Sequence, residues 1–395
     1  MPYDFGFDGQ NAATPFTWST AGLPTVNSTG TLVEYALSGD GLTLIGHIGD
    51  TTVEGDQVFK LELTDVPTGA YTFDVFKPLD HATANTEDDI VFDFGYTILD
   101  FDSDPASSVL SITWDDDSPE QTTATVTGAV EEEALTPDGN QDENDDGFET
   151  ADDSASASGS VTTLADVGAD QTGTFGINSA LSGVIQVDGV NLKSDGSDVS
   201  YVVVDGNTLE GRTNVADAST AVFTLVVEDD GDYLFTLKDQ LDHHLVADAD
   251  DEEGGLILDF SDAVEVTDED GDSLVLSQLE ANDGSVPAFS IAVEDDIPEQ
   301  TTATVTGAVE EEALTPDGNQ DENDDGFETA DDSAVATGSV TTLADVGADQ
   351  TGTFGINGAL TGVIQVDGTN LKSDGSDVSY VVVDPNTLEG RTNVE

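Results

Sequence analysis

An acidic loop in the middle of the chain has the ligand spacing of a calcium-binding loop. Asp138, Asn140 and Asp142 place side-chain oxygens at loop positions 1, 3 and 5, and Glu149 places a carboxylate at position 12. Oxygen ligands with this spacing can wrap around one calcium ion. Glu143 stands at position 6, where a helix–loop–helix site has glycine, and the flanks lack a helical pattern. The spacing predicts a single-loop calcium site, and the alternative is a flexible acidic insertion.

The loop occurs twice because a long segment of the chain is duplicated. Residues 119–215 recur as 298–394, a shift of 179 positions, with six substitutions that leave every acidic residue in place. The second loop therefore offers the same ligands, Asp317, Asn319, Asp321 and Glu328. A period this long indicates whole domains joined end to end, not a helical solenoid or a propeller blade. Near-identical copies favour a spacer over an enzyme, because a spacer gains length from each copy.

Two shorter Asp-rich turns could also bind a cation. Their carboxylates stand at alternate positions: Asp100, Asp102 and Asp104 in the first part of the chain, and Asp268, Asp270 and Asp272 in the later part. Alternate aspartates in a turn can converge on one calcium ion. A solvated turn rich in aspartate is the alternative.

Carboxylate trios mark the two points where one unit would join the next. The trios are Asp115, Asp116 and Asp117, and Glu294, Asp295 and Asp296, and a proline follows each of them two residues later. A cation held between two domains would bridge the end of one to the start of the next and stiffen the joint. The alternative is a charged linker that stays extended by self-repulsion.

The charge balance requires a source of positive charge outside the chain. The sequence has 84 acidic residues against 7 Lys and Arg, a formal net charge of −77, which excludes nucleic acid and anionic membrane surfaces as partners. Two carboxylates about 4 Å apart repel by roughly 4 kcal/mol at an effective dielectric near 20. A folded domain is stable by only about 5–15 kcal/mol. Either bound calcium offsets this repulsion, or monovalent salt screens it, as in a halophile.

The elements that must position these carboxylates are β-strands. Apolar and aromatic residues alternate in Tyr71-Thr-Phe73-Asp-Val75 and in its counterpart Tyr233-Leu-Phe235-Thr-Leu237, and amphipathic helices are lacking. The pattern predicts an all-β chain of tandem immunoglobulin-like β-sandwich domains with calcium-binding loops. We place three units at 1–117, 118–297 and 298–395, the last truncated relative to the full repeat. A cut near residue 215, giving two smaller sandwiches per repeat, is the alternative.

The remaining chemistry is sparse. Cysteine is absent, so neither disulfides nor thiolate metal sites hold the domains, and no stretch has the apolar length of a membrane span. His81 and the pair His243 and His244 follow predicted strands and lack a further soft ligand, which favours a structural role over a transition-metal site. Nucleophile elbows, phosphate-binding glycine loops and zinc-protease motifs are also absent. The sequence predicts a protein that is not an enzyme.

Four short motifs carry a resemblance to a known family. They are Leu-Asp-His at 241–243, Leu-Asp-Phe at 258–260, Thr-Asp-Glu-Asp-Gly-Asp at 267–272 and Val-Glu-Asp-Asp-Ile-Pro at 293–298. In this order they resemble the repeat domains of giant bacterial adhesins exported by type I secretion, the RTX adhesins. The resemblance implies calcium-bound extender domains at the cell surface, with Asp268, Asp270, Asp272, Asp295 and Asp296 as ligands. The glycine-rich nonapeptide of the RTX class is absent, so the export route and the extracellular location rest on analogy.

We therefore expect a monomeric, calcium-rigidified stalk that projects a ligand-binding tip for attachment and biofilm formation. Its partners would be calcium ions and the neighbouring repeat domains. One alternative is that the first unit binds a glycan or a protein through Trp18, Phe16 and Tyr35. The other, a secreted hydrolase with accessory repeats, would have to place a catalytic domain in a unit that aligns with its neighbours.

Overall fold

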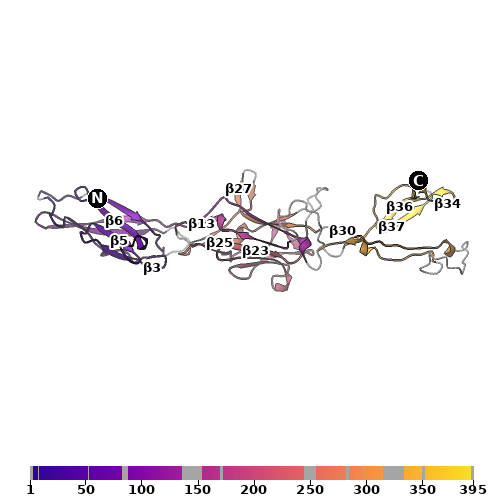
Figure 1. Cartoon of the computed structure of the whole chain (residues 1–395), viewed down its shortest axis with the longest axis horizontal. Coiled ribbons are helices and arrows are strands. Elements are labelled where there is room, and N and C mark those ends of the chain that lie inside the picture. The colour runs from indigo at the N-terminus through magenta and orange to yellow at the C-terminus, as the bar shows by residue number, and fades with distance from the viewer. Residues whose placement is uncertain are drawn as a thin grey trace. The chain divides into compact units, whose positions relative to one another are not determined.

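β-Strands form almost all of the regular structure, which confirms the predicted all-β fold. The computed structural model describes residues 3–7, 9–51, 53–81, 88–135, 154–169, 172–243, 255–281, 284–296, 298–314, 333–348 and 352–392. Within these ranges the only helices are single 3-10 turns, and none has the length and apolarity to cross a membrane. The described residues divide into two compact units. One contains the described residues up to 131, with 154–243 and 255–294, and the other contains residues 132–135 and the described residues from 295 onward (Figure 1).

The first compact unit begins with a sandwich of two antiparallel sheets, here called the first sandwich. One sheet has the order β4-β5-β6-β7 and the other the order β1-β8-β9. The strand bounds are β1 Phe16–Trp18, β4 Glu34–Leu37, β5 Thr43–His47, β6 Gln57–Asp65, β7 Ala70–Val75, β8 Ile90–Leu99 and β9 Pro105–Trp114, with a hairpin of β2 Asn27–Ser28 and β3 Thr31–Leu32 and the 3-10 turn η1 Glu54–Asp56.

Alternation along the strands builds the core of the first sandwich. In β8, Phe92, Phe94, Tyr96 and Ile98 are buried while the residues between them are more exposed. They pack in one apolar cluster with Phe59 and other residues of the same sandwich. Period-two alternation puts every second side chain on the same face of a strand, so this core follows directly from the sequence pattern.

A second sandwich, built from residues 120–131, 154–243 and 255–294, completes the first compact unit. Its sheets have the orders β12-β23-β22-β21-β20-β15, β11-β29-β24 and β14-β25-β26. These strands are β11 Val126–Glu131, β12 Ser156–Ser160, β14 Thr174–Ile177, β15 Gly183–Val184, β20 Ser200–Val203, β21 Thr208–Arg212, β22 Ala221–Val227, β23 Asp232–Leu237, β24 Leu256–Asp259, β25 Val264–Thr267, β26 Ser273–Val275 and β29 Phe289–Glu294.

Short hairpins and turns connect these sheets. The hairpins are β16 Gln186–Val187 with β17 Val190–Asn191, β18 Lys193–Ser194 with β19 Ser197–Asp198, and β27 Leu279–Ala281 with β28 Gly284–Val286, and β10 Glu120–Gln121 pairs with β13 Ala165–Asp166. The 3-10 turns of this sandwich are η3 Thr162–Leu164, η4 Ala218–Thr220 and η5 Ser261–Ala263. The turn η2 Glu132–Ala134, which follows β11 in the chain, belongs to the second compact unit.

Strands that are distant in sequence close the second sandwich. β11, near its start, pairs in parallel with β29, at its end, and β12 pairs with β23. β21 and β22, which lie on either side of residue 215, are adjacent antiparallel strands. The first half of this sandwich therefore depends for its pairing on strands that lie after residue 215.

The Leu-Asp-His motif has the same structural role in both sandwiches. Leu79 and Leu241 are buried in the two cores. The next residue accepts a hydrogen bond at the tip of a hairpin: Asp80 from the N–H of Gly30, and Asp242 from the N–H of Gly196. These glycines have φ angles of +73° and +74°, a backbone conformation that favours glycine.

The second compact unit contains residues 298–392 of the repeat, here called the third repeat. Its strands occur as isolated pairs: β30 Glu299–Gln300 with β31 Ala344–Asp345, β32 Gln365–Val366 with β33 Thr369–Asn370, β34 Lys372–Ser373 with β35 Ser376–Asp377, and β36 Ser379–Asp384 with β37 Thr387–Arg391. Two 3-10 turns accompany them, η6 Glu311–Ala313 and η7 Thr341–Leu343.

Candidate cation site

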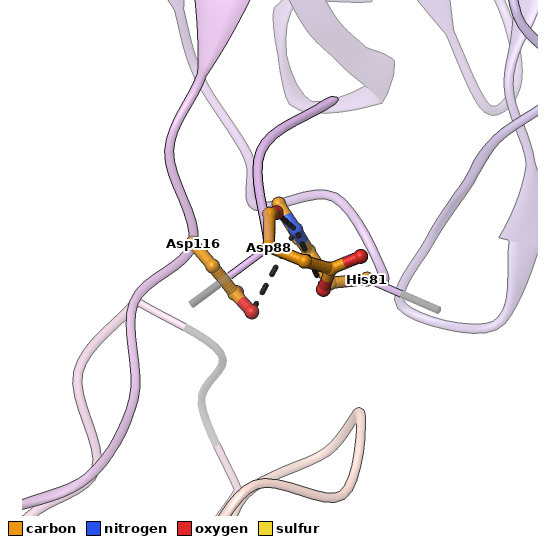
Figure 2. Close-up of side chains that lie close together, drawn as sticks. All are labelled: His81, Asp88 and Asp116. Carbon is orange, nitrogen blue, oxygen red and sulfur yellow. Dashed lines mark hydrogen bonds and ion pairs between the residues drawn. The ribbon is translucent and has the colours of Figure 1, made fainter. Parts of the chain in front are cut away.

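Strand pairing brings together two carboxylates at one end of the first sandwich. Ile90 at the start of β8 is paired with Trp114 at the end of β9, so Asp88 and Asp116, each two residues beyond that pair, lie close together. The Nδ1 atom of His81 lies 3.7 Å from Asp88 Oδ1 and 3.6 Å from Asp116 Oδ2. Figure 2 shows the three side chains pointing toward one another. The side chain of Asp116 is only 1% exposed.

The turn between β25 and β26 of the second sandwich gathers three more carboxylates. Asp268 Oδ1 accepts hydrogen bonds from the N–H groups of Gly271 (3.0 Å) and Asp272 (2.7 Å), which folds the turn around its side chain. One carboxylate oxygen from each of Asp268, Asp270 and Asp272 lies within 4.8 Å of the others. Asp268 and Asp272 are 4% and 2% exposed, so this turn is not the fully solvated turn of the alternative interpretation.

The two groups lie next to each other. The backbone N–H of His81 donates a hydrogen bond to Asp270 Oδ2 over 2.9 Å, although the two residues are 189 positions apart. Asp116 also interacts electrostatically with Asp270 and Asp272. The sequence predicted the linker trio and the Asp-rich turn as separate sites, and the structure places Asp116 of the trio next to the turn.

Several oxygens in this site are buried and accept no hydrogen bond from the described residues. They are Asp88 Oδ1, Asp116 Oδ2, Asp268 Oδ2 and Asp270 Oδ1. Burying a carboxylate oxygen without a hydrogen-bond donor or a counter-charge is costly. Oxygens grouped in this way could hold a cation.

The pKa values of Asp268 and Asp116 are raised, which is consistent with the same lack of positive charge. Burial, with Asp270 adding to its effect, raises the pKa of Asp268 to about 6. Burial also raises the pKa of Asp116, and the negative charges of Asp270 and Asp272 raise it further. The hydrogen bond from the N–H of Asp117 and the nearby His81 lower it. A cation would reverse both shifts, because opposite charge favours the ionised carboxylate.

The donor set fits a hard cation. His81 Nδ1 faces the backbone carbonyl oxygen of Asp88, which can only accept, so Nδ1 carries the hydrogen and cannot bind a metal. Carboxylate oxygens remain, and these suit calcium or magnesium better than softer metals. A cavity of about 280 Å³ lined by Asp115, Asp116, Asp117 and His81 gives access to the site.

The remaining predicted ligands lie in other settings. Asp115 is exposed, Glu294 is buried at the end of β29, Asp295 is half-buried and Asp296 is buried. Asp100, Asp102 and Asp104 lie close together at the end of the first sandwich opposite Asp116, but Asp102 and Asp104 are exposed. The two acidic loops, with Asp138, Asn140, Asp142 and Glu149 and with Asp317, Asn319, Asp321 and Glu328, lie outside the described residues.

Asp117 and Asp296 hold the loop of the domain that follows. Asp117 Oδ2 accepts from the N–H of Ala169 over 2.7 Å, and Asp296 Oδ2 accepts from the N–H of Ala348 over 2.6 Å. These two contacts occupy equivalent positions in the two copies of the repeat. Within each trio the last carboxylate thus binds a backbone N–H group of the domain that follows, and this contact is here called the clamp.

Sequence reasoning missed Asp88 and the contribution of His81. Asp88 follows no motif and belongs to an acidic stretch without regular spacing. The available signal for His81 was its position after the Leu-Asp pair in both sandwiches, which places it at a strand end. The pairing of β8 with β9, which brings Asp88 beside Asp116, is not local information.

The clamp predicts a specific effect at Gly168. A Cβ atom there would lie 2.6 Å from Asp117 Oδ2, so Gly168→Ala should displace the carboxylate from Ala169. Gly189→Ala is the matched control, because Gly189 has a similar φ (+78° against +74°) but nothing within 4 Å of its Cβ position. In urea unfolding, we expect Gly168→Ala to lower the free energy of unfolding by roughly 1 kcal/mol more than Gly189→Ala does. This difference is the typical net value of one hydrogen bond. Equal losses in both variants would contradict the clamp.

Comparisons of this chain with protein-family models, with curated proteins and with solved structures find no match.

Proposed function

We propose that this protein is a structural segment whose successive β-sandwiches are locked together by calcium, the stalk of a bacterial surface adhesin. The observation that carries the proposal is the closeness of Asp116 of the linker to Asp268, Asp270 and Asp272 of the second sandwich. Asp116, Asp268 and Asp270 each have a buried oxygen that accepts no hydrogen bond from the described residues. Because the proposed ligands belong to two consecutive sandwiches, binding of a cation is coupled to the orientation of one sandwich relative to the other.

The mechanism is electrostatic. Without a cation, the carboxylates repel one another and favour separation of the linker from the turn. With calcium bound, the same charges hold the linker, the end of β9 and the turn after β25 in one arrangement. In the repeated junction Asp295 stands at the sequence position of Asp116.

The adhesin assignment is supported by the ordered motifs, the repetition and the acidic composition. It implies a location at the cell surface, where calcium is plentiful, and no enzymatic activity. The alternative in which the first unit binds a ligand through Trp18, Phe16 and Tyr35 gains no support, since Phe16 and Trp18 are buried in the core and Tyr35 packs against it. These three aromatic residues stabilise the first sandwich.

The absence of cysteine allows a direct test of the lock. Exposed Val109 of the first sandwich and Val184 of the second can be changed to cysteine and spin-labelled. We expect calcium to narrow the distribution of distances between the two labels, and chelator to broaden it again. Labels at Val91 and Val109, both on the first sandwich, should give a distribution indifferent to calcium.

The same label pair on an Asp116→Asn, Asp270→Asn background identifies the site. Its distance distribution should remain broad at calcium concentrations that narrow the parent. If the double variant narrows like the parent, the sandwiches are held by another contact and the proposed lock is wrong.

A further inference from the structure

Lys77 is the one basic side chain that forms no ion pair among the described residues. The chain has 7 Lys and Arg against 84 acidic residues. All the other basic side chains are paired with a carboxylate: Lys60, Lys193, Arg212, Lys238, Lys372 and Arg391. Lys77 is therefore available to a negatively charged group from outside the described part of the chain.

The backbone holds Lys77 beside the cavity that adjoins the candidate cation site. Just beyond β7, the N–H groups of Phe76 and Lys77 both donate to the carbonyl oxygen of Val58, over 2.8 Å and 3.3 Å. Pro78 follows and restricts the backbone of Lys77 to extended conformations. Lys77 is half-buried and lines the cavity of about 280 Å³.

The rest of the cavity wall consists of an apolar part and a carboxylate part. The apolar part contains Val75, Phe76, Pro78, Leu79 and Trp114, and the carboxylate part contains Asp115, Asp116 and Asp117. Val75 and Phe76 are 54% and 45% exposed, although both side chains are large and apolar. Concave apolar surface with a few polar groups at its edge is typical of a binding site for a small molecule.

The second sandwich does not repeat this combination. Asp239 stands there at the position of Lys77 in the aligned Leu-Asp-His segment, and Val293 stands at the position of Trp114. A positive charge beside an aromatic wall is thus a property of the first sandwich alone, and it does not follow from the fold that the two sandwiches share.

We propose that this cavity binds a small organic carboxylate that carries an apolar group. The carboxylate pairs with the ammonium group of Lys77, which gives a charge-assisted hydrogen bond. The apolar group lies against Phe76 and Trp114, where its surface is removed from water. The cavity is slightly smaller than the roughly 300–1,000 Å³ of sites for drug-sized molecules, so its ligand has the size of about one ring.

The calcium dependence of this binding rests on the function proposed above. Asp115, Asp116 and Asp117 line the same cavity, and their negative charge repels a carboxylate. A divalent cation bound beside Asp116 offsets that charge, so the ligand then meets positive charge from the cation as well as from Lys77. Calcium should therefore raise the affinity for the carboxylate, and the carboxylate should raise the affinity for calcium by the same factor.

The test compares three probes that have the same ring: benzoate, the uncharged benzamide and the cationic benzylamine. Their affinities for the full chain are measured by ligand-observed NMR titration in calcium and in chelator. In calcium, benzoate should bind at least about 10-fold more tightly than benzamide, because only benzoate forms a charge-assisted hydrogen bond with Lys77. Benzamide or benzylamine binding as tightly as benzoate would overturn the proposal.

Two matched pairs of variants locate the site. Lys77→Gln should lower the affinity for benzoate about 10-fold or more, whereas Lys60→Gln, which removes a paired lysine of the same sandwich, should leave it unchanged. Val75→Asp should also weaken binding and Val109→Asp should not, because both valines are 54% exposed and only Val75 lines the cavity. Equal losses within either pair would contradict the assignment of the site.

Calcium calorimetry on the same samples separates this inference from the proposed lock. Benzoate should raise the affinity for calcium in the parent and not in Lys77→Gln. If calcium binds but benzoate does not, the cavity is not a carboxylate site and the lock stands. If the chain binds no calcium, the lock and the calcium dependence of the cavity are both wrong.

Discussion

Removal of calcium should lower the melting temperature of the first compact unit by roughly 8–16 °C for each site that is saturated in the native protein. A ligand that binds only the folded state at 1,000 times its dissociation constant stabilises it by about 4 kcal/mol. For domains of 150–250 residues each kcal/mol corresponds to about 2–4 °C. The effect has a structural basis in the carboxylates around Asp116, which have no described hydrogen-bond donor for several of their oxygens.

Calorimetric scans in calcium, in chelator and in chelator with added sodium chloride measure this difference. Sodium at matched ionic strength should restore little of the lost stability, because it screens exposed charges but does not fill a buried oxygen cage. A melting temperature that is the same in chelator and in calcium, and that rises steadily with sodium, would instead support the halophile interpretation.

Asp268→Asn should change stability in opposite directions with and without calcium. Asparagine retains the Oδ1 acceptor for the N–H groups of Gly271 and Asp272, so the turn keeps its hydrogen bonds. In chelator the variant should melt at a higher temperature than the parent, because a buried negative charge beside Asp270 is removed. In calcium it should melt at a lower temperature and bind the ion more weakly, because a charged ligand is lost.

The pH dependence of the metal-free protein gives an independent measurement. The folded-state pKa of Asp268 is about 6, above its ordinary value, so the folded protein binds more protons than the unfolded chain between about pH 4 and 6. Stability from this group is therefore present at low pH and is lost as the pH rises through 6. Metal-free parent should melt at a higher temperature at pH 5 than at pH 7, and Asp268→Asn should reduce that difference.

Asp100→Asn is the matched control for both experiments. Asp100 Oδ1 accepts from the N–H of Asp104 as Asp268 Oδ1 accepts from that of Asp272, but the turn at Asp100 has no counterpart of Asp116 and His81 among the described residues. We expect its calcium-dependent and pH-dependent effects to be smaller. If calcium reverses the sign of the change in melting temperature by the same amount in both variants, the turn alone binds the ion and the linker adds nothing.

The sequence alone determined the repeat, the all-β fold and the chemistry of the turns. The alternation of residue types in segments such as Tyr233–Leu237 is a local property. In the structure it corresponds to the buried and the more exposed faces of β23. The Asp-rich turn at 268–272 could likewise be identified by its spacing. A cation site could be expected from these carboxylates, because their oxygen chemistry does not depend on where the rest of the chain lies.

Only the tertiary structure decided which carboxylates meet. His81 and Asp270 are joined by a hydrogen bond across 189 positions, and Asp88 reaches Asp116 through the pairing of β8 with β9. Strand formation itself is decided in the same way, since Thr174–Ile177 is a strand while the identical residues 353–356 are not. A β-strand has no hydrogen bonds of its own, so its sequence supplies a pattern, and the partner strand, which can come from any distance along the chain, supplies the structure.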